Sequence, residues 1–208
     1  MKRREPRHVL FLCIGNRTRS VFAELFFRKL LKDHCLTDEI TVTSAGFILQ
    51  RFKDQLSELH IGFPEPFYTR PIAEATRTVL LTHAITVPDG WRSQEVSAYM
   101  VESADLIITA LPEQKEDLAE LYPHALHKIQ TIREISRWDG YLLMEDFNGY
   151  PLDDRLWDYI EEDLPYVSAM LSEMERLLIR AVPYVLERLG QARGPEMTDM
   201  ILEAGDPR

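Results

Sequence analysis

The amino-acid sequence predicts an α/β protein, namely a three-layer, doubly wound sheet of about four parallel strands with helices on both faces, followed by a C-terminal helical extension. Three features predict it. Short apolar runs, such as residues 9–12 (VLFL), alternate with stretches of helical periodicity. These runs are continuous, which is typical of strands buried on both faces. Residues 152–189 then keep a mostly helical pattern.

The predicted strands and helices alternate along most of the chain. The strands are predicted at residues 9–12, 40–43, 106–110 and 128–132. The helices are predicted at residues 20–32, 71–83, 93–103, 112–121 and 152–189. Pro71 suits the first position of its helix, whereas Pro165 and Pro183 are expected to break or kink the last one. Residues 47–70 are predicted to form a long loop.

Length and composition indicate one globular domain, residues 1–190, with a loose tail at residues 191–208. The formal net charge of −10 repels nucleic acid and anionic membranes, so neither is expected as a partner. No apolar run approaches the ~20 residues of a membrane span, and residues 9–14 are too short for a signal peptide. The chain has two cysteines and no Cys/His cluster, which indicates a cytoplasmic protein without a metal site or other cofactor.

Residues 13–20 (CIGNRTRS) connect the first predicted strand to the first predicted helix, and we refer to them as the 13–20 loop. Ligands of parallel sheets bind at the carboxyl ends of the strands, so a site is expected first at this loop. A cysteine six residues before an arginine is a weak signal alone. The pattern becomes specific because it follows a buried strand, contains Gly-Asn and ends in an Arg-Ser that opens an amphipathic helix.

The residue types of the 13–20 loop suit a phosphoryl group. Gly15 and Asn16 tolerate the left-handed backbone of a tight loop. The Arg19 guanidinium offers a planar fork for two phosphate oxygens. The positive field favours the thiolate of Cys13, which can attack phosphorus and form a phosphocysteine that water hydrolyses. Phosphate binding through the loop and the helix N-terminus is predicted for Ile14, Gly15, Asn16, Arg17, Thr18 and Ser20.

Residues 11–29 (FLCIGNRTRSVFAELFFRK) and 41–46 (TVTSAG) closely resemble the start of a low-molecular-weight protein tyrosine phosphatase. The pattern of that family is a cysteine, any residue, Gly-Asn, two residues and Arg-Ser. The resemblance continues more weakly through residues 104–108 to the acidic segment near Asp146. It implies a small doubly wound fold and a phosphatase that acts on phosphotyrosine protein or another aryl phosphate.

The resemblance also implies a role for individual residues of the site. By position, Cys13 becomes the nucleophile and Arg19 the phosphate clamp. Asn16 and Ser44 become residues that order the loop, and Ser20 stabilises the thiolate. No metal is expected, because the loop dipoles and Arg19 stabilise the charge that a metal would otherwise stabilise.

The general acid of that family is an aspartate late in the chain, usually followed by proline. Asp146 occupies this place here, with Asp139 and Asp153 as alternatives. The proline is replaced by Phe147, and residues 148–149 are Asn-Gly where the family often has aromatics that wall the substrate ring. The preference for phosphotyrosine therefore stays open.

Two residues of the 13–20 loop also depart from many members of the family. Thr18 stands where a second cysteine often protects the nucleophile as a disulfide, so that protection is absent. Arg17 adds a second guanidinium at the mouth of the loop, which favours an anionic or doubly phosphorylated substrate.

The aromatic side chains of residues 47–70 are predicted either to line the substrate site or to pack in the interior.

Two further functions stay open from the sequence. An arsenate reductase would use Cys13 against arsenate; no cysteine follows Cys35 to pass a disulfide along, so the reductant would be a small thiol. A non-catalytic phosphate-binding module would keep the loop without a working acid. A homodimer also stays open, because one apolar stripe suits either the core or a subunit contact: Met170, Leu171, Met174, Leu177 and Leu178.

Overall fold

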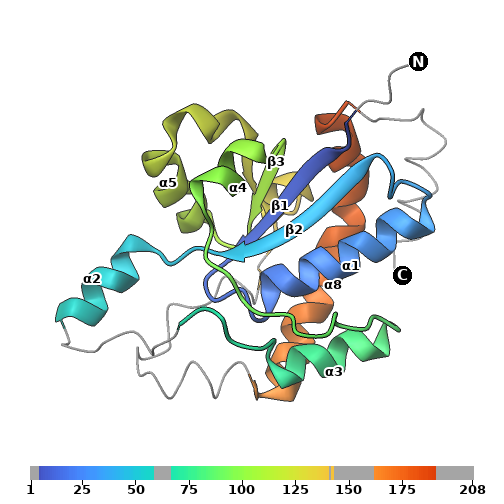
Figure 1. Cartoon of the computed structure of the whole chain (residues 1–208), viewed down its shortest axis with the longest axis horizontal. Helices are drawn as coiled ribbons and strands as arrows, with labels where there is room; N and C mark the ends of the chain where they lie inside the picture. The colour runs from blue at the N-terminus through green and yellow to red at the C-terminus, as the bar shows by residue number, and fades with distance from the viewer. Residues whose placement is uncertain (1–4, 59–66, 141, 143–161, 191–208) are drawn as a thin grey trace.

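The computed structural model describes residues 5–58, 67–140, 142 and 162–190 of the 208-residue chain. Within them, four parallel strands form one sheet in the order β2-β1-β3-β4 (Figure 1). The strands are β1 (Arg7–Cys13), β2 (Ile40–Gly46), β3 (Leu106–Thr109) and β4 (Ile129–Thr131). The predicted α/β fold with a parallel sheet is therefore confirmed.

β1 lies between β2 and β3 and is buried on both faces. Val9 and Phe11 pack into one hydrophobic cluster, whereas Leu10 and Leu12 pack into another. Successive side chains of a strand point to opposite faces, so a strand covered on both sides needs an apolar residue at every position. The chain therefore leaves β1 inside the sheet, at its carboxyl edge.

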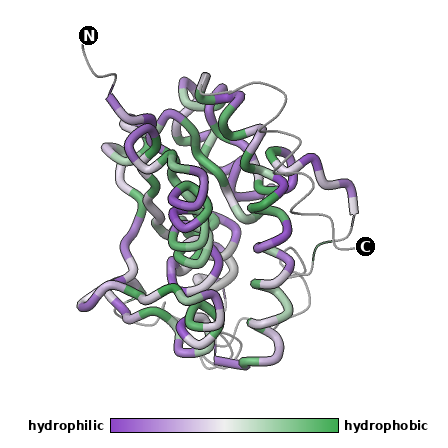
Figure 2. Tube along the Cα trace, turned by 90° about the vertical axis from the view of Figure 1, so that its right-hand side faces the viewer, coloured by the Kyte–Doolittle hydropathy of each residue, from purple (hydrophilic) through white to green (hydrophobic). Residues whose placement is uncertain are grey.

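Helices cover both faces of the sheet, as predicted. One face carries α1 (Arg19–Asp33), α3 (Glu74–Thr82), α6 (Ile132–Ile135) and α8 (Leu164–Arg188). The other face carries α4 (Ala98–Ser103), α5 (Pro112–Leu121) and the 3-10 helix η1 (Pro123–Lys128). In Figure 2 the hydrophobic and hydrophilic colours alternate along the helical turns, as expected for helices that bury one side.

The apolar stripe of α8 faces the interior of the chain. Its five residues are at most 3% exposed and belong to the same cluster as the buried residues of α1 and α3. The stripe therefore forms part of the core and is not presented as a subunit contact. The stripe consists of Met170, Leu171, Met174, Leu177 and Leu178.

α8 contains both of the prolines at which a break or kink is predicted. Pro165 lies in the first turn, where a missing N–H removes no helical hydrogen bond. Pro183 lies inside the helix and is buried with its neighbours, so packing holds the helix together at the lost hydrogen bond. The predicted C-terminal helix is confirmed for residues 164–188, and the break predicted at Pro165 is also found, because Asp163 is not helical and caps a new helix there. Pro183 causes no break.

Two predicted helices begin later than expected. α3 begins at Glu74, so Pro71 lies before the helix and not at its first position. Of residues 93–103 only 98–103 are helical, and Ser97 caps them by accepting from the N–H of Met100. Residues 94–96 instead pair with the end of β2: Gly46 N–H donates to Gln94 O, and Val96 N–H donates to Gly46 O. These long-range hydrogen bonds replace the helical ones.

The long loop predicted at residues 47–70 contains a helix, α2 (Gln50–Glu58). Its first N–H, that of Gln50, donates to the Asp117 carboxylate of α5 at 2.7 Å, and Arg51 forms an ion pair with Glu113. α2 points away from the sheet in Figure 1. A helix of this length is marginal alone, so these contacts with α5 explain why the sequence pattern did not predict it.

Candidate active site

The 13–20 loop lies at the carboxyl edge of the sheet, where β1 ends at Cys13 and α1 begins at Arg19. Both neighbouring strands hold its start. Phe47 N–H, just beyond β2, donates to Cys13 O at 2.7 Å, and Ala110 N–H, just beyond β3, donates to Leu12 O at 2.9 Å. The first residues of the loop are therefore fixed by the sheet itself.

Asn16 holds the loop in a left-handed turn. Its φ is 53°, a conformation that Asn adopts more readily than most residues. Its side-chain amide donates to Ser20 Oγ at 3.0 Å and to Ser44 Oγ at 2.8 Å, and its Oδ1 accepts from Gln94 N–H at 3.0 Å. One buried side chain therefore joins the loop, α1, β2 and residues 93–97.

The Cys13 thiol lies next to the Ser20 hydroxyl. The Sγ–Oγ distance is 3.0 Å, and both residues are 2% exposed. Ser20 Oγ accepts from Asn16, so its own proton is left to point toward the sulfur or toward Ala45 O at 3.3 Å. A thiolate can only accept hydrogen bonds, and the Ser20 hydroxyl is placed to donate one.

The hydrogen bonds continue from Ser44 to a buried carboxylate that the sequence interpretation missed. Ser44 Oγ donates to Glu24 Oε2 at 2.5 Å, and Arg28 forms an ion pair with Glu24 Oε1 at 2.7 Å. Burial raises the pKa of Glu24, while the Ser44 hydrogen bond and the Arg28 charge partly oppose the rise. The available signal was a glutamate four residues after Ser20, on the same face of the amphipathic helix.

Tyr68 packs against the outside of the loop. Its hydroxyl donates to Ile14 O at 3.2 Å, and its ring contacts Phe67 edge-on at 5.1 Å between centroids. A Cβ at Gly46 would lie 2.6 Å from Ile14 O and closer still to the Tyr68 ring, so only glycine fits there. Burial, with the nearby charges of Glu95 and Cys13, raises the pKa of Tyr68, which keeps its hydroxyl a donor.

Arg17 and Arg19 are both buried, at 6% and 4% exposure. Arg19 is the first residue of α1, so Cys13 and Arg19 lie at the two ends of one loop as expected. The Arg17 guanidinium is bound to the protein: Nε donates to Pro71 O at 3.0 Å, and a terminal nitrogen lies 3.5 Å from Glu162 Oε1. Part of the Arg17 guanidinium is therefore bound by the protein itself, and its predicted preference for an anionic or doubly phosphorylated substrate stays a prediction.

Thr18 is buried at the N-cap position of α1 but makes no side-chain capping hydrogen bond. Its Oγ1 has no hydrogen-bond partner among the residues that the structure describes. A buried hydroxyl without a partner costs free energy. Thr18 is therefore a candidate to contact a bound anion, in line with the binding role that the sequence predicts for it.

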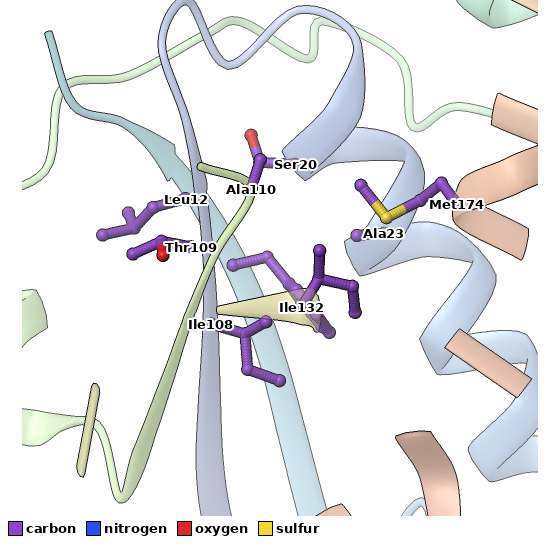
Figure 3. Close-up of a pocket in the computed structure, with 9 residues that line it drawn as sticks. Leu12, Ser20, Ala23, Ile108, Thr109, Ala110, Ile132 and Met174 are labelled. Atoms are coloured by element: carbon purple, nitrogen blue, oxygen red, sulfur yellow. The ribbon is translucent and has the colours of Figure 1, made fainter. Parts of the chain in front are cut away.

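A small cavity lies behind the loop, between the ends of β1 and β3 and the start of α1 (Figure 3). The centre of a water molecule could move within only about 10 Å³ of this cavity. The cavity therefore has room for one water at most. The cavity is therefore too small for a substrate. It is lined by Phe11, Leu12, Ser20, Ala23, Ile108, Thr109, Ala110, Ile132 and Met174.

The candidate general acid Asp146 and the alternative Asp153 fall outside the described residues, whereas Asp139 is exposed, two residues beyond the turn that follows α6. No group of three or more metal-ligating side chains occurs within residues 5–58, 67–140, 142 and 162–190. In this same part of the chain, no helix has the length and hydrophobicity that a membrane crossing requires.

The family model described as "Low molecular weight phosphotyrosine protein phosphatase" matches residues 8–146, which include the whole 13–20 loop and Asp146. A search of curated proteins gives no significant match.

Solved structures share the fold at low identity. A low molecular weight protein tyrosine phosphatase from T. tengcongensis is 24% identical, with a TM-score of 0.60 over 85% of this chain and 97% of that one. The YwlE arginine phosphatase from Geobacillus stearothermophilus is 20% identical, with a TM-score of 0.60 over 91% and 99% of the two chains. A YwlE mutant from Bacillus subtilis is 20% identical, with a TM-score of 0.62 over 87% and 99%.

Proposed function

The chain belongs to the low molecular weight phosphotyrosine protein phosphatase family and is a hydrolase of that family, and from this premise we propose that it is a cytoplasmic, cysteine-dependent phosphomonoesterase whose nucleophile is Cys13. The observation that carries the proposal is the Cys13 Sγ–Ser20 Oγ contact of 3.0 Å, at the start of a loop that also contains Arg19. A buried thiol with an aligned hydroxyl donor can be stabilised as the thiolate that attack on phosphorus requires.

The proposed reaction has two displacement steps. In the first, Cys13 Sγ forms a bond to phosphorus while the bond to the leaving oxygen breaks, and Asp146 gives that oxygen its proton. In the second, Asp146 takes a proton from water, the water oxygen forms a bond to phosphorus while the S–P bond breaks, and inorganic phosphate and the Cys13 thiolate are released. The backbone N–H groups of the 13–20 loop and the Arg19 guanidinium stabilise the phosphoryl oxygens throughout.

The proposed substrate is a phosphotyrosine protein or another aryl phosphate. Support comes from Phe67 and Tyr68, whose rings pack beside the loop and give its rim an aromatic side. Two of the structural relatives are named as arginine phosphatases, so a phosphoarginine peptide is the natural competitor in a substrate test.

The first experiment measures hydrolysis of a small aryl phosphate by the reduced protein with EDTA present. The wild type should turn over, and Cys13→Ser should lose activity by a factor of about 1,000 or more because its hydroxyl is a far weaker nucleophile. Cys35→Ser is the matched control, since Cys35 is exposed beyond the end of α1, and it should keep wild-type activity.

Turnover that survives Cys13→Ser, or that EDTA removes, would contradict the proposed nucleophile. A folded wild type that hydrolyses neither an aryl phosphate, a phosphotyrosine peptide nor a phosphoarginine peptide would contradict the phosphatase. Arsenate turnover with a small thiol would then indicate an arsenate reductase, and phosphate affinity alone would indicate a binding module.

A further inference from the structure

We infer that Glu162 is a positioning residue for the 13–20 loop, and that it holds the Arg17 guanidinium against α3 and so limits the positive charge offered to an anion. This inference rests on the proposed function, because it concerns the same phosphate site. Glu162 lies just before α8 and outside residues 8–146, the part of the chain that the family model matches.

The Glu162 carboxylate contacts two separate parts of the molecule. Its Oε1 lies 3.5 Å from a terminal nitrogen of Arg17. Its Oε2 accepts from two backbone N–H groups at the start of α3, those of Glu74 at 3.0 Å and Ala75 at 3.4 Å. One side chain thus links the start of α8 to the loop and to a helix that begins 88 residues earlier.

The position of this carboxylate is set by α3, whose first N–H groups have no capping side chain of their own. The N-cap residue of α3 is Ala73, which has no side-chain oxygen and makes no capping hydrogen bond. The free N–H groups at a helix start require acceptors, and a negative charge is favourable there. Glu162 meets both needs, and the next residue, Asp163, caps α8 through Tyr166 N–H. The side chain is therefore held at a defined place although it is 42% exposed.

Arg17 is fixed as firmly from the other side. Its side chain is 7% exposed, Nε donates to Pro71 O at 3.0 Å, and Ala73 N–H donates to Arg17 O at 3.2 Å. The guanidinium therefore lies between residues 71–73 and the Glu162 carboxylate. A carboxylate this close offsets much of the charge that a second arginine would otherwise add to the loop.

A purely structural role for Glu162 makes a different prediction. If Glu162 only capped α3, removal of its charge would change thermal stability and leave anion affinity unchanged. Glu162→Gln separates the two roles, because glutamine keeps an acceptor oxygen for the α3 N–H groups and loses the negative charge beside Arg17.

The test measures binding of inorganic phosphate to the reduced full chain by isothermal titration calorimetry. We expect Glu162→Gln to bind phosphate about threefold to tenfold more tightly, as a charge removed at this range would produce. In an Arg17→Gln background the same substitution should change the dissociation constant by less than about twofold. With an aryl phosphate, Glu162→Gln should lower KM by a similar factor and leave kcat nearly unchanged.

Glu74→Gln is the control for general charge. Glu74 lies at the same end of α3 and pairs with Arg77 at 3.4 Å, so its removal should leave phosphate affinity unchanged within about twofold. Unchanged or weaker phosphate binding by Glu162→Gln, or an equal effect in the Arg17→Gln background, would overturn the inference. A wild type that binds no phosphate at all is a different result, because it would remove the proposed function and the inference with it.

Discussion

The 13–20 loop is held from two sides that differ in chemistry. On the sheet side, Asn16, Ser44 and Glu24 form a buried row of hydrogen bonds between 2.5 and 3.0 Å. On the α8 side, Arg17 meets Glu162 at 3.5 Å, and the carboxylate is 42% exposed. The first side is built from β2 and α1, which lie next to the loop in the fold, whereas the second comes from a residue that follows Arg17 by 145 positions in the chain.

This difference indicates how each side responds to change. Removing one member of a buried row of hydrogen bonds costs much stability, because its partners stay buried without a hydrogen-bond partner. A partly exposed ion pair is worth little free energy and is screened by salt. The sheet side should therefore decide whether the loop forms at all, and the α8 side should adjust how strongly the formed loop attracts an anion.

The largest effect is expected from Asn16→Ala, which breaks the sheet side. The substitution leaves Ser44 Oγ and Gln94 N–H without their Asn16 partner and places alanine in a left-handed turn. We expect kcat/KM for an aryl phosphate to fall about 100-fold, equivalent to roughly 3 kcal/mol. Steady-state kinetics measure it, and wild-type kinetics in a folded variant would show that the row does not order the loop.

Gly46→Ala tests the close packing of Tyr68 on the loop. The added Cβ would lie 2.6 Å from Ile14 O, which is backbone and cannot move aside cheaply. We expect a loss of about 2 kcal/mol in the free energy of unfolding, measured with urea. Gly90→Ala is the comparison, because its φ of 72° is strained but nothing surrounds the new Cβ, so about 1 kcal/mol is expected. Equal losses would contradict the packing argument.

Glu24→Gln should change how the stability of the protein depends on pH. The raised pKa of Glu24 means that the folded protein keeps a proton that the unfolded chain releases, so wild-type stability is lost as pH rises from about 4.5 through the raised value. Glutamine cannot ionise, so the variant should gain stability relative to wild type between pH 4.5 and pH 7.5. Urea unfolding at both pH values measures this gain.

Glu134→Gln is a control in which the expected dependence of stability on pH has the opposite direction. Burial alone would raise the pKa of Glu134, but the Lys115 ammonium and the Thr131 hydrogen bonds outweigh it and lower the pKa. The stability that ionised Glu134 contributes should therefore be present above the ordinary pKa range of a carboxyl group. It should be lost as the pH falls through the lowered pKa. The same direction of change in both variants would contradict the assignment for Glu24.

The smallest effect is expected from salt on the Arg17–Glu162 pair. Because Glu162 is partly exposed, the difference in phosphate affinity between wild type and Glu162→Gln should shrink by about half or more between 0.05 M and 0.5 M sodium chloride. Calorimetry at the two concentrations measures it. A difference that does not depend on salt would place the effect of Glu162 in loop geometry, not in charge.

Parts of the fold whose signals are local could be predicted from the sequence. β1 and β3 are short continuous apolar runs, and α5 has the predicted bounds, 112–121, because Pro112 marks its first turn. Residues 93–97 and α2 could not be predicted, because hydrogen bonds to Gly46 and Asp117 decide their structure. Such partners lie tens of residues away and leave no periodic pattern.

The candidate site divides in the same way. Cys13, Asn16, Ser20 and Arg19 stand close together in one motif, so the proposed phosphate site is visible in eight consecutive letters of sequence. By itself the sequence determined the parallel sheet, the position of the loop at its edge and the residue types that make the loop suitable for a phosphoryl group. The physical reason is that strand burial, turn conformation and helix starts depend on neighbouring residues.

Only the tertiary structure decided which distant side chains close on the loop. Glu24 has the periodicity of an ordinary helix residue, Tyr68 lies in a stretch without regular pattern, and Glu162 stands in an acidic run typical of a solvated helix face. In the folded chain, Glu24 accepts from Ser44, Tyr68 donates to the backbone oxygen of Ile14, and Glu162 pairs with Arg17. Contacts of this kind are set by how helices pack on the sheet, and that packing is a property of the whole chain.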